Sequence, residues 1–338
     1  MKSPQFWYIA PGVTSWQSII LRPLSRLYQN ATKRRVAKPI LIKATCPVIC
    51  VGNLNAGGTG KTPTVIALAE EASALGASHV IVSRGYGGAL KGPVHVDAKR
   101  HKAREVGDEP LLLSAFASTI VAKERVDGAA LAETLKPDLI LLDDGFQDPS
   151  VEKTKSLVVV DAEKGFGNGL CIPAGPLREP IAQGLQRADA ILSIGAKTAQ
   201  DNFAKLWKGQ IPCPHATARI TPLTTGMDWS KEKYVAFAGI GHPEKFFKTL
   251  DDLGANLVHK EGLADHAELS TALLKRLKIM ANDAGAQLVT TEKDAARLPQ
   301  NFRTEVLTLP VRLVMDDRVF LRKFVQDALT ATTSSTVP

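Results

Sequence analysis

The sequence contains a glycine-rich loop of the kind that binds nucleotide phosphates. An apolar run at residues 48–51 leads into the loop, and Gly60, Lys61 and Thr62 open a helical pattern. Backbone N–H groups of such a loop converge on phosphate oxygens, the lysine faces the β- and γ-phosphates, and the threonine hydroxyl can ligate Mg²⁺. Pro63 suits a first helical turn, whose N–H groups lack partners within the helix. The predicted phosphate-binding residues are Asn55, Ala56, Gly57, Gly58, Thr59, Gly60, Lys61 and Thr62.

One position of this loop departs from the usual pattern, G-x-x-x-x-G-K-[ST]. Asn55 stands where the pattern has its first glycine. Asparagine tolerates a left-handed backbone better than most residues. We therefore expect Asn55 to replace the glycine without disturbing the loop.

A second motif places two acidic residues, Asp143 and Asp144, directly after the apolar run at residues 139–142. Acids at the end of a strand are often only turn formers. However, Mg²⁺ on a nucleotide needs a hard oxygen ligand near the threonine of the phosphate-binding loop. We interpret the two acids as Mg²⁺ ligands of a domain that hydrolyses nucleotides or transfers phosphoryl groups.

Several other motifs place arginine and aspartate among glycine and proline. Arg84 and Arg178 could each clamp a phosphate or form an ordinary surface salt bridge. Asp108 could accept a hydroxyl proton, as the catalytic aspartate of protein kinases does, or cap a helix that starts near Pro110. The motifs cover residues 83–88, 106–110, 165–169 and 173–180.

Two candidates lie in the last third of the chain. His266 is one of seven histidines, and a lone histidine more often starts a helix or packs in a core than performs catalysis. Residues 290–294 follow a predicted strand and could contact a nucleotide or cap a helix. The sequence leaves both questions open.

Strands and helices alternate along the chain from residue 47. Continuous apolar strands that alternate with helices are typical of a parallel sheet covered on both faces. We therefore expect the α/β fold class: a P-loop NTPase-like parallel sheet sandwiched by helices, a second and smaller α/β domain, and a short linker. Strands are predicted at residues 48–51, 79–82, 139–142, 157–160, 190–194, 235–238, 257–259, 288–290 and 306–309, and helices at residues 64–75 and 128–135.

These patterns divide the chain into five parts. Residues 1–30 form an amphipathic N-terminal segment, and residues 31–215 form the P-loop domain. Residues 216–233 interrupt the alternation and are the expected linker. Residues 234–330 form the smaller C-terminal domain, and the Thr/Ser-rich residues 331–338 are expected to fray.

The composition excludes several classes of protein. The 338 residues suffice for two domains with real cores, and 44% hydrophobic with 22% charged residues excludes a disordered or fibrous chain. Four cysteines exclude a disulfide scaffold, and their spacing fits no zinc site, so we expect buried thiols. No apolar run approaches the roughly 18 residues of a transmembrane helix.

The positive charge is concentrated near the N-terminus. The formal net charge is +8, yet no Asp or Glu precedes Glu70. A basic segment on a charge-balanced body indicates a local anionic surface rather than nucleic acid, and no aromatic-interleaved basic patch is present. We therefore expect no nucleic-acid partner.

Residues 13–28 carry an apolar stripe at helical spacing. Pro23 suggests two short helices, with the proline near the start of the second. Such a stripe suits either a helix in a membrane interface or a surface helix packed on the core. The basic run at residues 33–43 favours an anionic membrane surface, so we expect a cytoplasmic, peripheral protein. The stripe consists of Val13, Trp16, Ile20, Leu24 and Leu27, with Arg22 and Arg26 opposite.

In this order, the motifs resemble those of the tetraacyldisaccharide 4′-kinase family, the lipid A 4′-kinases of Gram-negative bacteria. The resemblance extends from the aromatic N-terminus to about Leu298. The matching segments are residues 51–53, 57–63, 83–87, 107–110, 143–147, 165–169, 173–180, 265–266 and 290–294.

The resemblance implies a phosphotransferase with an alcohol group as acceptor. Its substrates would be ATP with Mg²⁺ and tetraacyldisaccharide 1-phosphate, whose 4′-hydroxyl is phosphorylated to give lipid IV-A in lipopolysaccharide biosynthesis. It further implies a two-stranded linker between the domains. The enzyme would work at the cytoplasmic face of the bacterial inner membrane, and we expect a monomer.

The resemblance also assigns roles to residues. It maps a catalytic dyad onto Asp108 and His266, with Lys61 on the transferred phosphate. Arg84 and Arg178 become candidates to bind the acceptor. The metal candidates are Thr62, Asp143, Asp144 and Glu109.

Two positions depart from the family pattern. Asp148 stands where the family often has histidine after Asp-Gly-Phe-Gln, so the role of position 148 is left open. Ala267 follows His266 where another histidine or a polar residue is frequent.

Two rival interpretations remain at this stage. A partitioning-type P-loop ATPase shares the glycine-rich loop, but it carries an extra lysine where this chain has Ala56. A nucleic-acid-binding module would use the basic run at residues 33–43, but the rest of the chain offers no recognition motif.

Overall fold

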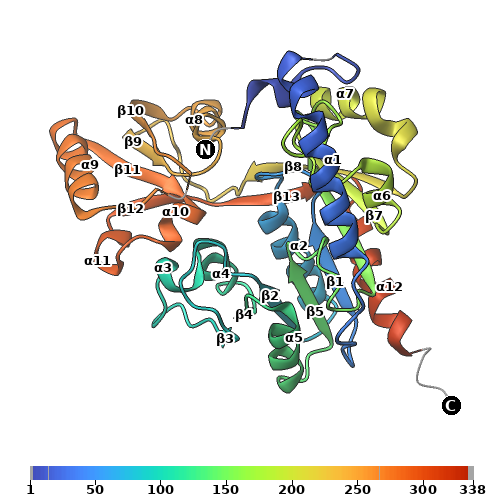
Figure 1. The fold of residues 1–338 in the computed structure, drawn as a ribbon. Helices are drawn as coiled ribbons and strands as arrows, with labels where there is room; N and C mark the ends of the chain where they lie inside the picture. The colour runs from blue at the N-terminus through green and yellow to red at the C-terminus, as the bar shows by residue number, and fades with distance from the viewer. Residues whose placement is uncertain (1–2, 14, 266, 334–338) are drawn as a thin grey trace.

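A nine-stranded sheet forms the centre of the larger domain in the computed structural model, which describes residues 3–13, 15–265 and 267–333 (Figure 1). The strand order is β13-β8-β7-β6-β1-β5-β2-β4-β3, and only the two edge pairs, β3–β4 and β8–β13, are antiparallel. The strands are β1 (Val48–Gly52), β2 (His79–Ser83), β3 (Val94–His95), β4 (Ser118–Val121), β5 (Leu139–Asp143), β6 (Lys155–Asp161), β7 (Ala190–Ile194), β8 (His215–Pro222) and β13 (Val311–Met315).

Helices cover both faces of this sheet, as the continuous apolar strands predict. On one face α2 and α12 pack on β1 and β5 through Leu68, Phe324 and Val325. On the other face α5, α6 and α7 bury Ala129, Leu185 and other apolar side chains. The helices of this domain are η1 (Gln5–Tyr8), α1 (Trp16–Val36), α2 (Lys61–Ala74), α3 (Ala103–Val106), α4 (Asp108–Leu113), α5 (Arg125–Thr134), α6 (Ile181–Leu185), α7 (Lys197–Trp207), η2 (Lys208–Gln210) and α12 (Phe320–Thr333).

The smaller domain has its own parallel sheet of four strands, in the order β10-β9-β11-β12. Separate apolar cores lie on its two faces, one around Tyr234 and Phe247 and the other around Phe237 and Leu277. Its elements are β9 (Lys233–Ala238), α8 (Pro243–Asp252), β10 (Asn256–Gly262), α9 (Thr271–Asp283), β11 (Ala286–Thr291), α10 (Glu292–Ala296), α11 (Gln300–Arg303) and β12 (Val306–Leu309). Every strand predicted for this domain is present.

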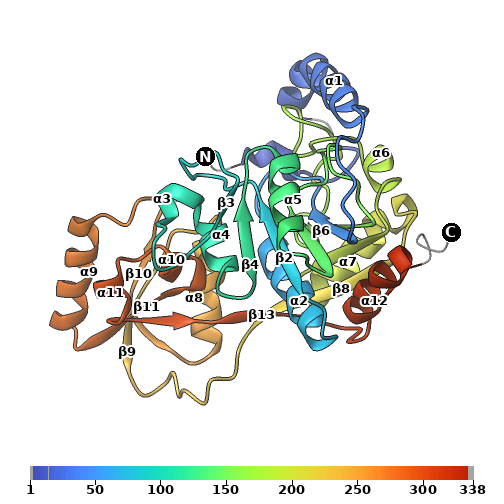
Figure 2. The same cartoon turned by 90° about the horizontal axis from the view of Figure 1, so that it is seen from below.

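The domain boundary predicted from the sequence is wrong at its C-terminal end. Residues 311–333 belong to the larger domain, because β13 pairs with β8 and α12 packs on α2. The predicted linker is also partly strand, since β8 starts at His215 and pairs with β7. The antiparallel pair β8–β13 runs between the domains and forms the two-stranded linker that the resemblance implies (Figure 2). A chain that returns to an earlier domain leaves no signal in local periodicity.

The N-terminal segment forms one long helix rather than two short ones. Helix α1 continues through Pro23, and the side chain of Ser15 caps its start by accepting a hydrogen bond from the Ser18 N–H. The Ser18 and Ser25 hydroxyls donate to the carbonyls of Ala174 and Cys171, at 3.1 and 2.9 Å. Because these bonds anchor the helix before and after Pro23, tertiary contacts compensate for the backbone bond that the proline cannot make.

Candidate active site

The glycine-rich loop leaves β1 at the carboxyl edge of the large sheet, where open α/β sheets bind their ligands. Gly57 and Gly60 have φ angles of +110° and +94°, so both lie in the left-handed region. Gly60 is also the N-cap of α2, which puts Lys61 and the half-buried Thr62 in its first turn. The strand, loop and helix predicted from the sequence are therefore confirmed.

Asn55 has a different role from the one that its glycine position suggests. Its φ is not among the positive values of the described residues. Its side-chain N–H donates instead to the Gly165 carbonyl, at 2.9 Å, and its backbone forms an isolated bridge with Leu177. The Ala56 N–H donates to the Pro176 carbonyl at 2.7 Å. The loop is thus held by segment 165–177 of the same domain.

Asn53 also shapes the loop, although the sequence analysis gave it no role. Its side-chain N–H group donates to the Gly57 carbonyl and to the Thr59 hydroxyl, both at 3.2 Å. The Asn53 carbonyl in turn accepts a bond from Gln147 at 2.8 Å. Its position within the motif of residues 51–53 was the only available signal.

Asp144 lies next to two cations of the site. The Lys61 ammonium is 3.7 Å from its Oδ1, and an Arg178 guanidinium nitrogen is 3.0 Å from the same oxygen. Burial by itself would raise the pKa of Asp144, but Lys61 and Arg178 together outweigh it and hold the pKa below its ordinary range. Asp144 is therefore an ionised group beside the phosphate-binding lysine.

Asp143 is buried and only partly satisfied. Its Oδ2 accepts a hydrogen bond from the Ser83 hydroxyl at 2.9 Å, whereas Oδ1 has no partner among the described residues. Burial, followed by the charge of Glu109, raises the pKa of Asp143 to about 7. An oxygen that is buried without a partner is costly unless a cation or a donor occupies the space beside it. Asp143 therefore fits a hard cation such as Mg²⁺, which binds to one or two carboxylates together with phosphate oxygens.

No group of three or more His, Cys, Asp or Glu side chains arranged to hold a metal occurs within residues 3–13, 15–265 and 267–333. A magnesium site here would therefore need the oxygens of the nucleotide to complete its coordination.

Arg125 holds the backbone of the acidic pair, a contact that no motif of the sequence predicted. Its guanidinium donates to the carbonyl of Asp143, at 3.1 Å, and to that of Asp144. The same group contacts the Asp148 carboxylate at 3.3 Å, and Asp148 accepts a bond from the Ser150 N–H at 3.0 Å. In this structure Asp148, whose role the sequence left open, holds Arg125 and the following turn.

Asp108 and Glu109 form the first turn of α4. The N-cap of this helix is Gly107, with φ +91°, so the prediction that Asp108 might cap the helix is wrong. Asp108 is buried, and its Oδ2 lies 3.6 Å from the ammonium of Lys293, which comes from the smaller domain. Glu109 lies 3.2 Å from the same ammonium. The charge of Glu109 also acts on Asp143, which places α4 near the acidic pair.

The two candidate arginines differ. Arg178 lies within the site, where it bonds Asp144 and Gln147, so it is not a surface salt bridge. Arg84 is exposed and has no ion pair with any residue that the structure describes. His266 lies outside the described residues, so the geometry of the implied dyad is not part of the structure.

Residues 290–294 cap a helix and also contribute to the site. The Thr291 hydroxyl accepts a bond from the Asp294 N–H at 3.1 Å and so caps α10. Lys293 reaches from the same helix to Asp108 and Glu109. The sequence motif therefore combines a local structural role with a contact between the domains.

The glycine motif of residues 165–169 binds the N-terminal segment. The Asn168 N–H donates to the Trp7 carbonyl at 2.7 Å, and the Trp7 indole N–H donates to the Pro173 carbonyl at 3.0 Å. Gly165, Gly167 and Gly169 all have positive φ angles, so the backbone curls around these contacts.

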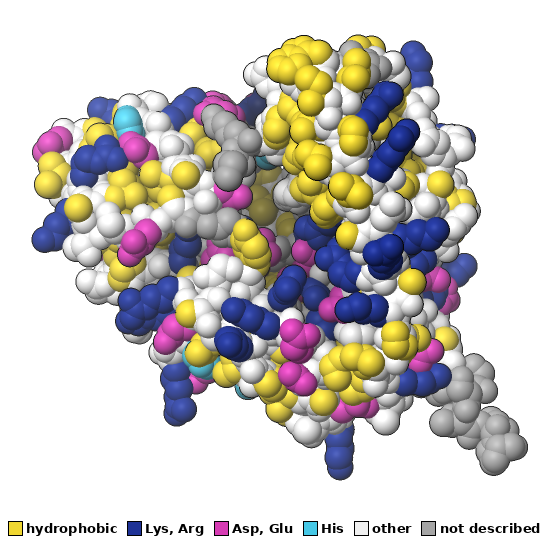
Figure 3. Space-filling view, viewed as in Figure 1, with side chains coloured by type: hydrophobic (Ala, Val, Ile, Leu, Met, Phe, Trp, Pro, Cys, Tyr) yellow, Lys and Arg dark blue, Asp and Glu magenta, His cyan; other side chains and the backbone are white. Residues whose placement is uncertain are grey.

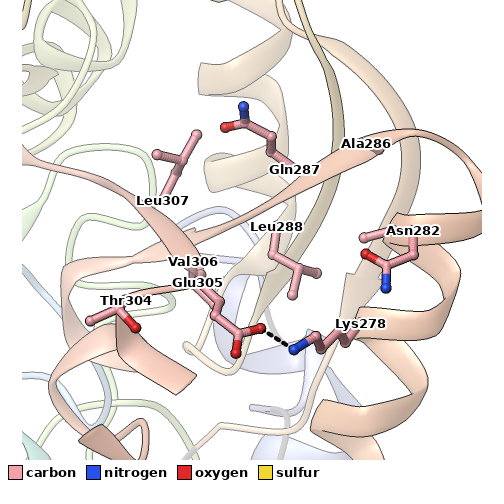
Figure 4. A pocket seen from close by; sticks show the side chains of 10 residues that line it. Lys278, Asn282, Ala286, Gln287, Leu288, Thr304, Glu305, Val306 and Leu307 are labelled. Carbon is pink, nitrogen blue, oxygen red and sulfur yellow. Dashed lines mark ion pairs between the residues drawn. The ribbon is translucent and has the colours of Figure 1, made fainter. Parts of the chain in front are cut away.

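A pocket of about 270 Å³ lies elsewhere, in the smaller domain (Figure 4). It is lined by the amino-terminal ends of β11 and β12 and by the end of α9, and an ion pair between Lys278 and Glu305 crosses it. The active-site contacts of this domain come from the opposite, carboxyl ends of these strands. This pocket is therefore separate from the phosphate-binding site.

Comparison with known proteins identifies relatives over nearly the whole chain. The family model described as LpxK, tetraacyldisaccharide-1-P 4′-kinase, matches residues 17–330. The chain is 56% identical to the tetraacyldisaccharide 4′-kinase of Dinoroseobacter shibae, over 94% of each protein. It is 51% identical to the corresponding kinase of Jannaschia sp., over 94% of this chain and 96% of that protein.

A solved structure shares the fold. A crystal structure of LpxK from Aquifex aeolicus in complex with ATP superimposes with a TM-score of 0.75 and 25% identity, over 92% of this chain and 99% of that one.

Proposed function

The chain belongs to the tetraacyldisaccharide 1-phosphate 4′-kinase family, and on this premise we propose how its residues perform the reaction. The protein is a kinase that transfers phosphate from ATP to the 4′-hydroxyl of tetraacyldisaccharide 1-phosphate in lipid A biosynthesis. One observation supports the assignment of roles. Lys61, the acidic pair and the acids of α4 gather at one edge of the large sheet.

The phosphate-binding loop and Lys61 hold the β- and γ-phosphates of ATP. Backbone N–H groups of residues 57–62 face the phosphates, and the Lys61 ammonium neutralises charge that develops during transfer. Asp144 and Arg178 hold Lys61 and each other in a network of opposite charges, which fixes the lysine for this role.

Thr62 and Asp143 would bind Mg²⁺ directly. The carboxylates of Glu109 and Asp144 would lie near the cation and attract it by their negative charge. When bound, it neutralises charge on the phosphates and orients them for in-line attack. The unpartnered Oδ1 of Asp143 supports this placement, because a cation there removes the cost of a buried charge.

Asp108 accepts the proton of the attacking sugar hydroxyl. It is buried at the start of a helix beside the acidic pair, where an ionised carboxylate can be aimed at an acceptor. His266 is its proposed partner on the family resemblance alone. Arg178, and Arg84 at the exposed rim, are proposed to position the lipid headgroup.

Helix α1 is proposed to place the enzyme on the cytoplasmic face of the inner membrane as a monomeric, peripheral protein. None of the helices in the described part of the chain combines the length and the hydropathy that a bilayer span requires. The buried residues of α1 are Ser18, Ser25 and Thr32, whereas most of its large apolar residues are exposed and Tyr28 packs partly against the core. Figure 3 shows hydrophobic side chains gathered over α1, with Lys and Arg side chains along the same surface. The exposed large apolar residues of α1 are Trp16, Ile19, Ile20, Leu24 and Leu27, and Val13, just before the helix, is exposed as well.

Because hydroxyl residues of α1 are buried and its apolar stripe is exposed, we favour a helix that lies in a membrane interface over a surface helix packed on the core. An exposed apolar face with a basic flank binds at the boundary between headgroups and acyl chains. The lipid substrate lies at the same depth, so the helix would bring the site to its acceptor.

The catalytic assignment can be tested with Asp108→Asn. Loss of the base should lower kcat about 1,000-fold, while the Kd for ATP stays unchanged. Radiolabel transfer from γ-labelled ATP to detergent-dispersed lipid measures the rate. Asp201→Asn, at an exposed aspartate of α7, is the control and should keep wild-type kcat. Near-normal kcat in Asp108→Asn would refute the assignment.

The membrane assignment can be tested with Ile20→Glu. Sedimentation with vesicles of phosphatidylglycerol and phosphatidylethanolamine should fall sharply, because a charge replaces an anchor residue. Ile279→Glu, at a similarly exposed isoleucine of α9, is the matched control, since Ile20 is 64% and Ile279 is 60% exposed. Equal sedimentation of the two variants would contradict a role for α1.

A further inference from the structure

Lys293 of the smaller domain reaches the acids of α4. Its ammonium lies 3.2 Å from Glu109 Oε1 and 3.6 Å from Asp108 Oδ2. Its helix, α10, packs against α4. The side chain is 21% exposed, so this contact is largely shielded from water.

The backbone that carries Lys293 is fixed on both sides. Asp294 is fully buried and bonds the Gly239 N–H, the Thr291 hydroxyl and Arg297, all within the smaller domain. Glu292, on the other side, bonds Arg312 of the linker strand β13 at 3.0 Å. Because both neighbours are held, the Lys293 side chain is presented to α4 from a defined place.

The charge around Lys293 matches its position. The Lys293 ammonium lies between the carboxylates of Glu109 and Asp108, so opposite charges meet where the two domains touch. Asp265, in the segment that carries the implied partner histidine, also acts on this ammonium.

A second contact between the domains offers a comparison. Lys245 of α8 contacts Glu163 at 2.6 Å and Asp161 at 3.3 Å, just beyond and at the end of β6. This contact also joins the smaller domain to the larger one, but Lys245 and Glu163 are about half exposed, although Asp161 is largely buried, and none of the three is assigned to catalysis. The two lysines thus make similar contacts, one inside the site and one outside it.

We infer that Lys293 is a positioning residue for phosphoryl transfer: the smaller domain supplies its charge to hold Asp108 and Glu109 in place. This inference rests on the proposed role of Asp108. Lys293 acts through the carboxylates rather than on the substrate directly. The smaller domain therefore completes the catalytic arrangement only when it is docked on α4.

The test compares Lys293→Met, Lys293→Arg and Lys245→Met in the full-length enzyme. Lys293→Met should lower kcat about 100-fold, the loss expected when a catalytic group is misplaced by about 1 Å. The KM values for ATP and lipid should change by less than about threefold, because no substrate contact is removed. Lys293→Arg keeps the charge and should recover most of the lost kcat. Thermal melting checks that each variant is folded.

Lys245→Met distinguishes positioning from simple docking of the domains. It should leave kcat within about threefold of wild type. An equal loss of kcat in Lys245→Met and Lys293→Met would overturn the inference, and so would Lys293→Met with unchanged kcat or Lys293→Arg no better than Lys293→Met. Asp108→Asn is measured in parallel. If it retains kcat, the proposed function fails; if it loses kcat while Lys293→Met does not, only the inference on Lys293 fails.

Discussion

Each domain buries an aspartate near the carboxyl end of a parallel strand, but the two aspartates differ in their surroundings. Asp143 is the last residue of β5, and Asp294 lies in α10, the helix that directly follows β11. Asp294 of the smaller domain is fully paired: one oxygen accepts from the Gly239 N–H and the Thr291 hydroxyl, and the other contacts Arg297. Asp143 of the larger domain has the Ser83 hydroxyl on one oxygen and no described partner on the other. Both side chains are almost completely shielded from water.

This difference separates a structural carboxylate from a functional one. A buried carboxylate whose lone pairs are all satisfied stabilises the local backbone. A buried carboxylate that lacks partners destabilises the unliganded fold, and a ligand that brings a cation removes that cost. The comparison therefore predicts opposite effects for the same substitution at the two positions.

The largest expected effect is on catalysis at Asp143. Asp143→Asn should lower kcat about 1,000-fold, because the amide cannot replace a charged metal ligand. The kcat of Asp294→Asn, measured on protein that remains folded, should fall much less. Phosphate transfer to the lipid measures both rates. A smaller loss of kcat in Asp143→Asn than in Asp294→Asn would contradict the assignment of Asp143 as the functional carboxylate and Asp294 as the structural one.

The next effect is on folding at Asp294. Asp294→Asn leaves the buried Arg297 charge uncompensated and should lower the free energy of unfolding by about 3 kcal/mol. Urea unfolding followed by tryptophan fluorescence measures this loss, and the contribution of Trp229 reports on the core of the smaller domain, in which it is buried. An unchanged midpoint would show that Arg297 does not need its partner.

Asp143→Asn should have the opposite effect on stability. The pKa of Asp143 is raised to about 7 from 3.8, so the folded state keeps the proton that the unfolded state has released. Stability from this group is present below pH 4 and is lost as the pH rises through 7. At pH 8, metal-free Asp143→Asn should therefore melt about 3 °C above wild type. A lower melting temperature of Asp143→Asn than of wild type at pH 8 would contradict the interpretation that the ionised Asp143 carboxylate destabilises the metal-free fold.

The smallest effect concerns the cation itself. Adding Mg²⁺ without nucleotide, at ten times its Kd, should stabilise wild type by about 1.4 kcal/mol. Asp143→Asn should lose this response, whereas Asp294→Asn should keep it. Thermal melting with and without MgCl₂ gives the difference, with CaCl₂ as a test of selectivity. A full response in Asp143→Asn would place the cation elsewhere.

Much of the fold was predictable because its signals are local. The strands around residues 48–51 and 139–142, the helix after Lys61 and the second alternation from residue 235 all appear where the pattern places them. Apolar runs and glycine-rich turns determine these elements within a few residues of chain. The same holds for the loop and for the acids that follow β5.

Other features depended on contacts that no local pattern contains. The continuation of α1 through Pro23 rests on Ser18 and Ser25 bonding a loop about 150 residues away, as the separations of 156 and 146 show. The return of β13 and α12 to the larger domain rests on pairing with β8 and packing on α2. The outward direction of the apolar stripe on α1 likewise follows from which face the domain binds.

The sequence by itself determined the family, the phosphate-binding loop, the acidic pair and the class of reaction, because these depend on residue types at fixed short spacings. Only the tertiary structure decided which charges meet. It placed Lys61 and Arg178 beside Asp144. It bonded Arg125 to the backbone carbonyl of Asp143. It also brought Lys293 to Asp108 and Glu109. Such contacts join residues far apart in the chain, and the strength of a buried charge depends on the groups and the solvent around it rather than on its place in the sequence.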